Sequence, residues 1–265
     1  MAEGGALLTP ERFARASDAT WPGERIEWIG GWKLRFTEDA GSRGASAWAA
    51  EAESSMEPTA IAARTGEVTR AYGRAGLRPR FQIWPSDTQI DQALETAGWE
   101  RYDRSLLMVR PATPPIEVPP PGPDAVREGR EAMAVAVRTP IALLDEVWQE
   151  GGIGPARRAV LDRGQGPKAL FLGRVGMQPA GAVAMTLDGE VGITQALWVV
   201  PAARRSGLAS VLMAAASRFA ADAGASVIAH AVLEENMPAI RLYERLGFRP
   251  FGAYHYRQAP VEDEV

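Results

Sequence analysis

Apolar residues recur at helical spacing in one long stretch of the second half of the chain. Between Ser206 and Gly224 they fall three or four positions apart, which predicts a helix over 206–223 that ends at the glycine. Shorter apolar runs rich in β-branched residues surround it and predict strands. Beyond residue 124 we expect further helices over 141–149, 155–162 and 238–246, and strands over 168–175, 180–187, 190–200, 226–232 and 253–258.

The first 110 residues carry the same two periodicities. They predict helices over 9–16, 58–75 and 88–97, and strands over 25–36, 44–51, 80–84 and 104–110. Thr9 is the expected N-cap of the first helix, with Pro10 in its first turn. Helices interleaved with strands predict an α/β (α+β) fold with a mixed sheet.

A proline-rich segment separates the two halves. Residues 111–123 read PATPPIEVPPPGP, which is too rich in proline for a helix or a central strand and is typical of a semi-rigid linker. We therefore expect a domain over 1–110, a linker over 111–123 and a second domain over 124–265.

The two halves also repeat each other. ALETAGWERYDRSLLMVR, from Ala93, aligns without gaps on LYERLGFRPFGAYHYRQA, from Leu242, with Gly98 on Gly247. A helix, a glycine, an aromatic residue and a strand occur together in many α/β proteins, so coincidence is the alternative to duplication. The proline-rich linker and the matching order of elements favour duplication.

Composition narrows the class of protein. The chain has 265 residues, a formal net charge of −4 and no cysteine. The acidic balance disfavours nucleic acid as the main partner, and the lack of cysteine excludes disulfides, thiolate metal sites and a cysteine nucleophile. We see neither a signal-peptide pattern nor an apolar run long enough for a membrane span. We expect a cytoplasmic protein that needs no membrane, either monomeric or homodimeric.

The junction before the long helix is the first candidate site. LWVVP (197–201) predicts a strand that ends at a proline, and AARRSGLA (202–209) leads from it into the helix. Unpaired N–H groups and the helix dipole favour an anion there, and Arg204 and Arg205 add positive charge. Gly207 allows an unusual φ and a close approach of the backbone to phosphate. The alternative is a plain strand–turn–helix with arginines on the surface.

A second motif follows the next strand. It reads VLEENMPAIRLYERLGF (232–248) and places Asn236 at the loop and Tyr243 about two helical turns later. Asn236 could contact an amide-bearing ligand, cap the helix that Pro238 begins, or do both. Tyr243 could act as an acid or be a core aromatic residue.

Together the two motifs resemble the GNAT superfamily of N-acetyltransferases. The resemblance covers about 124–258 and is sharpest over 197–248, and the whole chain is similar to a tandem GNAT with a degenerate first half. It implies two GNAT-like domains, each a twisted, mostly antiparallel mixed sheet flanked by helices. By the repeat, the basic junction falls near residues 55–60, where Pro58 replaces the glycine, so we expect one active site per chain.

The resemblance implies acetyl-CoA as acyl donor, no metal, and an amine as the other substrate. Tyr243 would be the general acid, and a strand N–H near Val199 would stabilise the oxyanion. The strand IAHAV (228–232) lacks the carboxylate that many members carry, which leaves Glu190 and His230 as candidate bases. The implied cofactor-binding residues are Leu197, Trp198, Val199, Arg204, Arg205, Ser206, Gly207, Leu208, Ala209, Ser210 and Asn236.

The sequence therefore predicts an N-acetyltransferase acting on a small molecule or peptide by direct attack in a ternary complex. A non-catalytic acyl-CoA-binding or regulatory module is one alternative, favoured by the missing carboxylate and disfavoured by Tyr243. A nucleotide-binding protein is a second alternative, but neither G-x-x-x-x-G-K-[ST] nor G-x-G-x-x-G occurs in the chain.

Overall fold

The computed structural model describes residues 7–51, 56–137 and 141–260. Its helices are α2 (Pro10–Thr20), α3 (Gly41–Gly44), α4 (Pro58–Arg74), α5 (Thr88–Thr96), α6 (Pro123–Arg127), α7 (Ala142–Glu150), α8 (Pro155–Arg163), α9 (Leu208–Asp222) and α10 (Met237–Arg245), with a 3-10 turn at Pro201–Ala203. Its strands are β1 (Arg25–Ile29), β2 (Trp32–Phe36), β3 (Ala47–Trp48), β4 (Arg80–Ile83), β5 (Glu100–Pro111), β6 (Ala132–Val137), β7 (Lys168–Val175), β8 (Gln178–Asp188), β9 (Val191–Val199), β10 (Val227–Leu233) and β11 (Arg249–Gln258).

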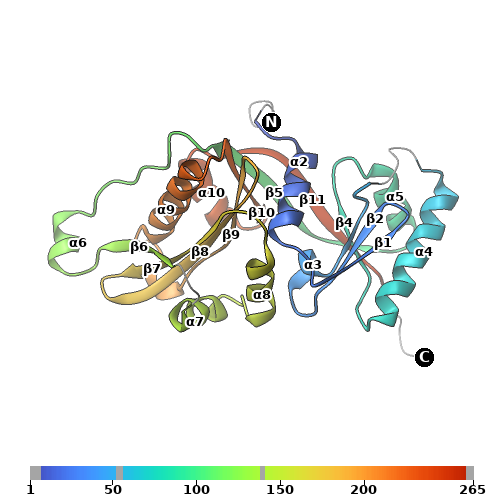
Figure 1. The fold of residues 1–265 in the computed structure, drawn as a ribbon, viewed down its shortest axis with the longest axis horizontal. Coiled ribbons are helices and arrows are strands. Elements are labelled where there is room, and N and C mark those ends of the chain that lie inside the picture. The colour runs from blue at the N-terminus through green and yellow to red at the C-terminus, as the bar shows by residue number, and fades with distance from the viewer. Residues whose placement is uncertain (1–6, 52–55, 138–140, 261–265) are drawn as a thin grey trace.

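All these strands form one mixed sheet. Their order is β1-β2-β3-β4-β11-β5-β10-β9-β8-β7-β6, and within the described residues the parallel pairs are β3–β4 and β9–β10. Figure 1 shows the two halves of the chain side by side, with this sheet running through both. The expected fold class, a mostly antiparallel mixed sheet flanked by helices, is confirmed.

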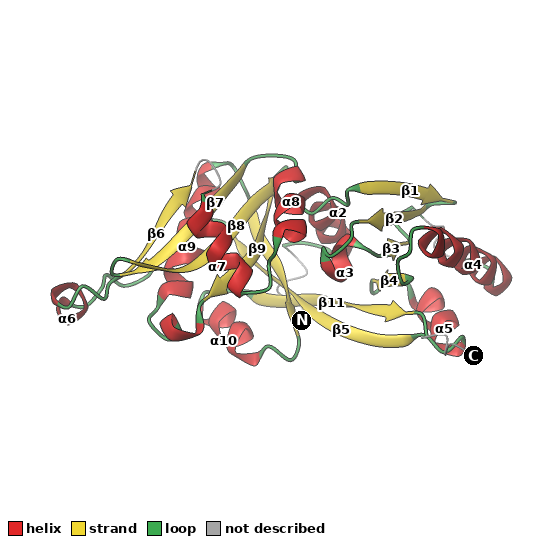
Figure 2. Cartoon of the chain, turned by 90° about the horizontal axis from the view of Figure 1, so that it is seen from below, coloured by secondary structure: helices red, strands yellow, loops and turns green. Residues whose placement is uncertain are grey.

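The two halves exchange strands at the centre of the sheet. β5 comes from the first half but lies between β10 and β11, where residues 105–111 pair with 227–233. β11, near the other end of the chain, lies between β4 and β5, and its residues 255–258 pair with residues 80–83 of β4. Figure 2 shows β5 and β11 running together from the side of α10 to the side of α5. Each half therefore completes its sheet with a strand from the other.

The internal repeat holds at the level of elements. A shift of 149 residues, from Gly98 to Gly247, carries α4, β4, α5 and β5 onto α9, β10, α10 and β11. Both glycines follow a helix with positive φ, 78° and 87°. The repeat predicted from the sequence is confirmed in the order and position of these elements.

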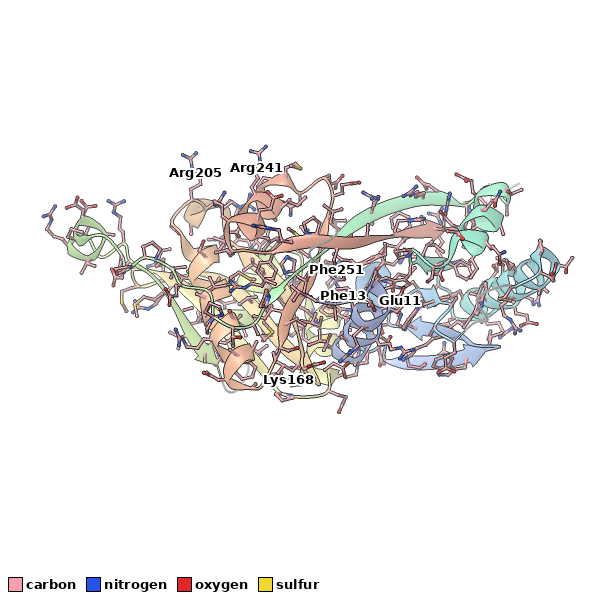
Figure 3. All side chains as sticks on the ribbon, turned by 90° about the horizontal axis from the view of Figure 1, so that it is seen from above. Glu11, Phe13, Lys168, Arg205, Arg241 and Phe251 are labelled. Atoms are coloured by element: carbon pink, nitrogen blue, oxygen red, sulfur yellow. The ribbon has the colours of Figure 1, made fainter. Side chains whose placement is uncertain are left out.

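Helices cover both faces of the second half of the sheet. α9 packs on β6 to β9, and α10 joins the same core through Ile240 and Tyr243. α7 packs on β8 and β9 from the opposite face, beside α2, which comes from the first half. Phe13 of α2 meets Phe251 of β11 with ring centroids 5.9 Å apart (Figure 3). No described helix has both the length and the hydropathy to cross a membrane.

Several predicted elements were wrong in form. Residues 25–36 fold as the hairpin β1–β2, because Gly30 and Gly31 both take positive φ and form a two-residue turn. Within 44–51 only β3 pairs as a strand, since the short helix α3 precedes it. Helix α6 and the edge strand β6 were not predicted. β5 also extends beyond the expected 104–110, and the proline-rich segment after it packs on α9, where the Ile116 N–H donates to Ser217 Oγ at 3.0 Å.

Candidate active site

β9 separates from β10 after the first three of its nine residues. The parallel pairing ends at Ile193 and Ala229, and neither strand has a partner on that side beyond this level. A bulge lies at the same place, because Ala182 of β8 faces Trp198 whereas Ala184 faces Gln195, so that β9 holds one extra residue. We call the space between the diverging strands the splay.

The splay leaves backbone groups of β9 free on one side. The Val200 N–H donates to the Ala180 carbonyl of β8 at 2.9 Å. Because successive backbone groups of a regular strand point in opposite directions, the N–H group of Val199 points away from β8 and into the splay. An extended ligand with amide groups could pair with this edge as an added strand does.

Trp198 is turned the other way. Its backbone pairs with Ala182 of β8. Its ring lies on the α7 face of the sheet and so close to Gly151 that a Cβ added to this glycine would be 2.6 Å from the ring. The Arg204 guanidinium stands 5.1 Å from the centre of this ring, and its Nε donates to the Val199 carbonyl at 3.4 Å. Of the three predicted strand residues, Val199 therefore faces the splay through its backbone, Leu197 lies in the bulge with its side chain against the core beneath α9, and Trp198 is turned away.

The junction between β9 and α9 has the form of an anion site. Gly207 is the N-cap of α9 with φ 86°, and Arg205 also takes a positive φ of 67°. Consecutive residues that include such conformations turn their N–H groups toward one concave side. Within the described chain no backbone acceptor is found for the N–H groups of Arg205, Ser206, Gly207 and Ala209.

The other predicted residues of the junction have local roles. Ser206 Oγ donates to the Ala203 carbonyl at 2.7 Å and lies 3.4 Å from the Leu208 N–H. The Ser210 N–H is already used, since it donates to the Gly207 carbonyl at 3.0 Å. Leu208 itself is buried in the core beneath α9. The first turn of α9 is thus held in place, with its outer N–H groups available.

Positive charge at the junction also comes from α10. Figure 3 shows Arg205 and Arg241 reaching out on the same side of the molecule. Arg241 is not among the residues that the sequence motifs predict, although it lies in the second turn of the helix that follows the splayed strand. Asn236 caps this helix, because its Oδ1 accepts from the Ala239 N–H at 3.2 Å. The capping role that the sequence allowed is therefore present.

Tyr243 belongs to an aromatic stack under α10. Its ring centroid is 3.8 Å from that of His230 and 5.8 Å from that of Phe248. The Tyr243 side chain is almost completely buried, and burial raises the pKa of its phenol above the ordinary value. Its hydroxyl has no hydrogen-bond partner among the described residues, so it remains a protonated, available donor.

The two candidate bases lie in different surroundings. Glu190 is exposed before the start of β9, seven residues and therefore about 23 Å from Leu197, so it lies at the wrong end of the strand. His230 does lie at the splay, but burial lowers the pKa of its imidazole to about 3, which makes it a weak base. Among the described residues, no group of three or more His, Cys, Asp or Glu side chains is placed to hold a metal.

At the junction predicted from the sequence, the structure thus combines a strand that leaves its neighbour with a basic helix N-terminus. The model of the Acetyltransferase (GNAT) family matches residues 142–248, so this part of the chain is similar to the acetyltransferases of that family. A curated relative, the mycothiol acetyltransferase of Clavibacter sepedonicus, is 37% identical over 116 residues. That match covers 42% of this chain but only 38% of the relative.

Solved structures share the fold over a longer span. A GCN5-related N-acetyltransferase from Kribbella flavida covers 97% of this chain, and this chain covers 97% of it, with a TM-score of 0.71 and 17% identity. The match to a tandem GNAT protein from the clavulanic acid biosynthesis pathway covers 76% of this chain and 70% of that protein's chain, with a TM-score of 0.53 and 16% identity. At these identities the likeness concerns the fold alone.

Proposed function

We propose that this protein transfers an acetyl group from acetyl-CoA to an amine of a small molecule or peptide, by direct attack in a ternary complex. The observation that carries the proposal is the splay of β9 from β10 beside the unpaired N–H groups of the junction. A single extended ligand with amides at one end and a pyrophosphate at the other satisfies both features.

The residues present fit acetyl-CoA in this orientation. The pyrophosphate would lie at 204–209, where the helix dipole, the free N–H groups and Arg204 favour negative charge. The pantetheine arm would pair with Leu197 and Val199, with Asn236 beside it. The thioester would then reach the level of the bulge, next to Tyr243.

The chemistry follows from these positions. The amine nitrogen forms a bond to the thioester carbon, and a β9 N–H facing the splay stabilises the charge that develops on the oxygen. The C–S bond then breaks, and the departing thiolate takes a proton from the Tyr243 hydroxyl. The nitrogen loses one proton and the sulfur gains one, so the products are an amide and free CoA.

The acceptor amine would react as the neutral base. Primary amines with a pKa near 10 are mostly protonated at neutral pH. Glu190 is distant and His230 is weakly basic, so neither stands ready to remove this proton. The proposal therefore includes an acetylation rate that rises with pH as the free amine becomes more abundant.

The test combines binding with turnover. Acetyl-CoA and CoA should raise the Tm, because they bind the folded state, whereas ATP should not. Free thiol should then appear when acetyl-CoA is mixed with an amine from a panel of polyamines, amino sugars and peptides. A shift with ATP alone would refute the proposal. Binding of acetyl-CoA without thiol release from any amine would favour the acyl-CoA-binding module instead.

A further inference from the structure

Two polar residues occupy neighbouring positions on β9 and β10 where the splay begins. The last paired residues are Ile193 of β9 and Ala229 of β10, so Thr194 and His230 are the first residues beyond the pairing. Ile193 and Ala229 point to the face covered by α2. By the alternation of a strand, Thr194 and His230 point to the opposite face, toward α9 and α10.

Both side chains are buried without partners. His230 is 3% exposed and Thr194 is 6% exposed. Among the residues that the structure describes, Nδ1 and Nε2 of His230 and Oγ1 of Thr194 have no hydrogen-bond partner. Buried polar atoms in folded proteins are nearly always paired, because leaving them unpaired costs free energy. Unpaired polar groups on two adjacent strands, at the inner end of the proposed acetyl-CoA site, indicate that the ligand supplies their partner.

The surroundings define what His230 can offer. Its ring is packed against Tyr243 at 3.8 Å and Phe248 at 4.6 Å between centroids, in a core that is otherwise apolar. Burial lowers the pKa of the imidazole to about 3. The ring is therefore neutral at physiological pH and carries one N–H donor and one acceptor nitrogen.

We propose that His230 is a catalytic residue that donates its imidazole N–H to the thioester oxygen, with the Thr194 hydroxyl as a second donor beside it. The inference rests on the proposed acetyl transfer. When the amine nitrogen bonds to the thioester carbon, an electron pair of the C=O bond moves onto the oxygen, and these donors stabilise it until the C–S bond breaks. Donors fixed in an apolar, water-poor site are more effective than the same groups in water.

The decisive variant is His230→Phe. A phenyl ring keeps the packing on Tyr243 and Phe248 and removes the two unpaired nitrogens, so the Tm without ligand should stay equal or rise. The kcat for thiol release should fall by about 10² to 10³-fold, as happens when an oxyanion donor is removed. The KM for acetyl-CoA should change little, and His230→Gln, which keeps an N–H donor, should recover part of the lost kcat.

The chain contains a matched control, because it has only one other histidine. His255 Nε2 lies 2.8 Å from Asp91 Oδ1 in the first half, away from the splay. His255→Phe should therefore lower the Tm and leave kcat unchanged, the reverse of His230→Phe. Retention of wild-type kcat in folded His230→Phe would overturn the inference.

A second readout does not need turnover. In ¹⁵N-labelled protein the imidazole signals of His230 should shift when acetyl-CoA is added and shift differently with CoA, which has no thioester oxygen, while those of His255 stay in place. Identical His230 signals with both ligands would overturn the inference even if acetyl transfer is real. If acetyl-CoA binds but no amine is acetylated, this measurement still decides the role of His230. Failure to bind either ligand would instead overturn the proposed function.

Discussion

Tyr243 and His230 show how burial sets the role of a single side chain. The two rings are stacked 3.8 Å apart in the same core, and burial acts on both. It raises the pKa of the phenol and lowers the pKa of the imidazole, so both groups are neutral across the physiological range. Neutral side chains of this kind donate hydrogen bonds or protons, and neither is suited to remove a proton from an ammonium group.

At this scale we predict the effect of Tyr243→Phe. Loss of the proton donor should lower kcat by about 10² or more, while the Kd for CoA stays unchanged, because the hydroxyl acts only when the C–S bond breaks. Since burial raises the phenol pKa, wild-type kcat should not fall between pH 7 and pH 9 through loss of this proton. Thiol release over that pH range measures both effects.

Tyr254→Phe is the matched control for this prediction. Tyr254 is also buried, but it lies in the core beneath α2, with its ring 4.8 Å from that of Trp84. Its hydroxyl should therefore be dispensable for thiol release. Equal losses of kcat in the two variants would show that Tyr243 has a structural role and is not the acid.

At the scale of elements, the two halves differ most at the start of the long helix. α9 begins at Gly207 in the left-handed conformation with free N–H groups before it. The equivalent helix α4 begins at Glu57 and Pro58. Proline has no N–H, and a carboxylate repels phosphate, so this helix start lacks what an anion site requires. This supports the prediction of one active site per chain.

Two glycines of α9 give a test of the junction. Gly207 and Gly224 stand at opposite ends of the helix with φ of 86° and 89°, and a Cβ on either would meet no atom within 4 Å. Replacing either with alanine should cost about 1–2 kcal/mol, because the strain comes from φ alone. Thermal unfolding should therefore show similar losses in the two variants.

Affinity for CoA should separate these variants. In Gly207→Ala the backbone should relax toward negative φ, and this turns N–H groups away from the phosphate. The affinity for CoA should therefore fall roughly ten- to hundredfold. Gly224→Ala should bind CoA as the wild type does. Equal Kd values by calorimetry would place the phosphate site somewhere other than 204–209.

At the scale of the whole molecule, the exchanged strands make the halves interdependent. Without β5, the second half would lose the strand between β10 and β11, and without β11 the first half would lose one of the two strands beside β4. The proposed boundary at 111–123 therefore divides the chain but not the sheet.

We predict that cutting this segment leaves the molecule intact. Residues 119–122 are exposed, so a protease site inserted there should be cleaved under native conditions. The two fragments should co-elute on size exclusion and keep the Tm shift with acetyl-CoA, because β5 and β11 remain paired. The uncut protein with the same insertion is the control. Separation of the fragments in native buffer would contradict the interlocked sheet.

Features that depend on a few neighbouring residues could be predicted from the sequence. The caps at Thr9 and Asn236 are present, and Gly207 takes the positive φ that its place before a helix suggested. The repeat was readable for the same reason, since each copy preserves its own local order of helix, glycine and strand. The Gly30-Gly31 hairpin turn was equally local and was overlooked, although adjacent glycines are a known signal for it.

Features that depend on pairing between distant residues were decided only by the tertiary structure. No local pattern places β5 beside β10, more than a hundred residues later, or puts His230 against Tyr243 and Phe248. The same holds for Glu190, which the sequence offered as a base until the direction of β9 put it at the far end of the strand. Sequence alone thus determined the form of the junction at 204–209, because a turn and a helix start are set by local φ preferences and hydrogen bonds. Which side chains share the splay depended on strand register, which only the folded sheet defines.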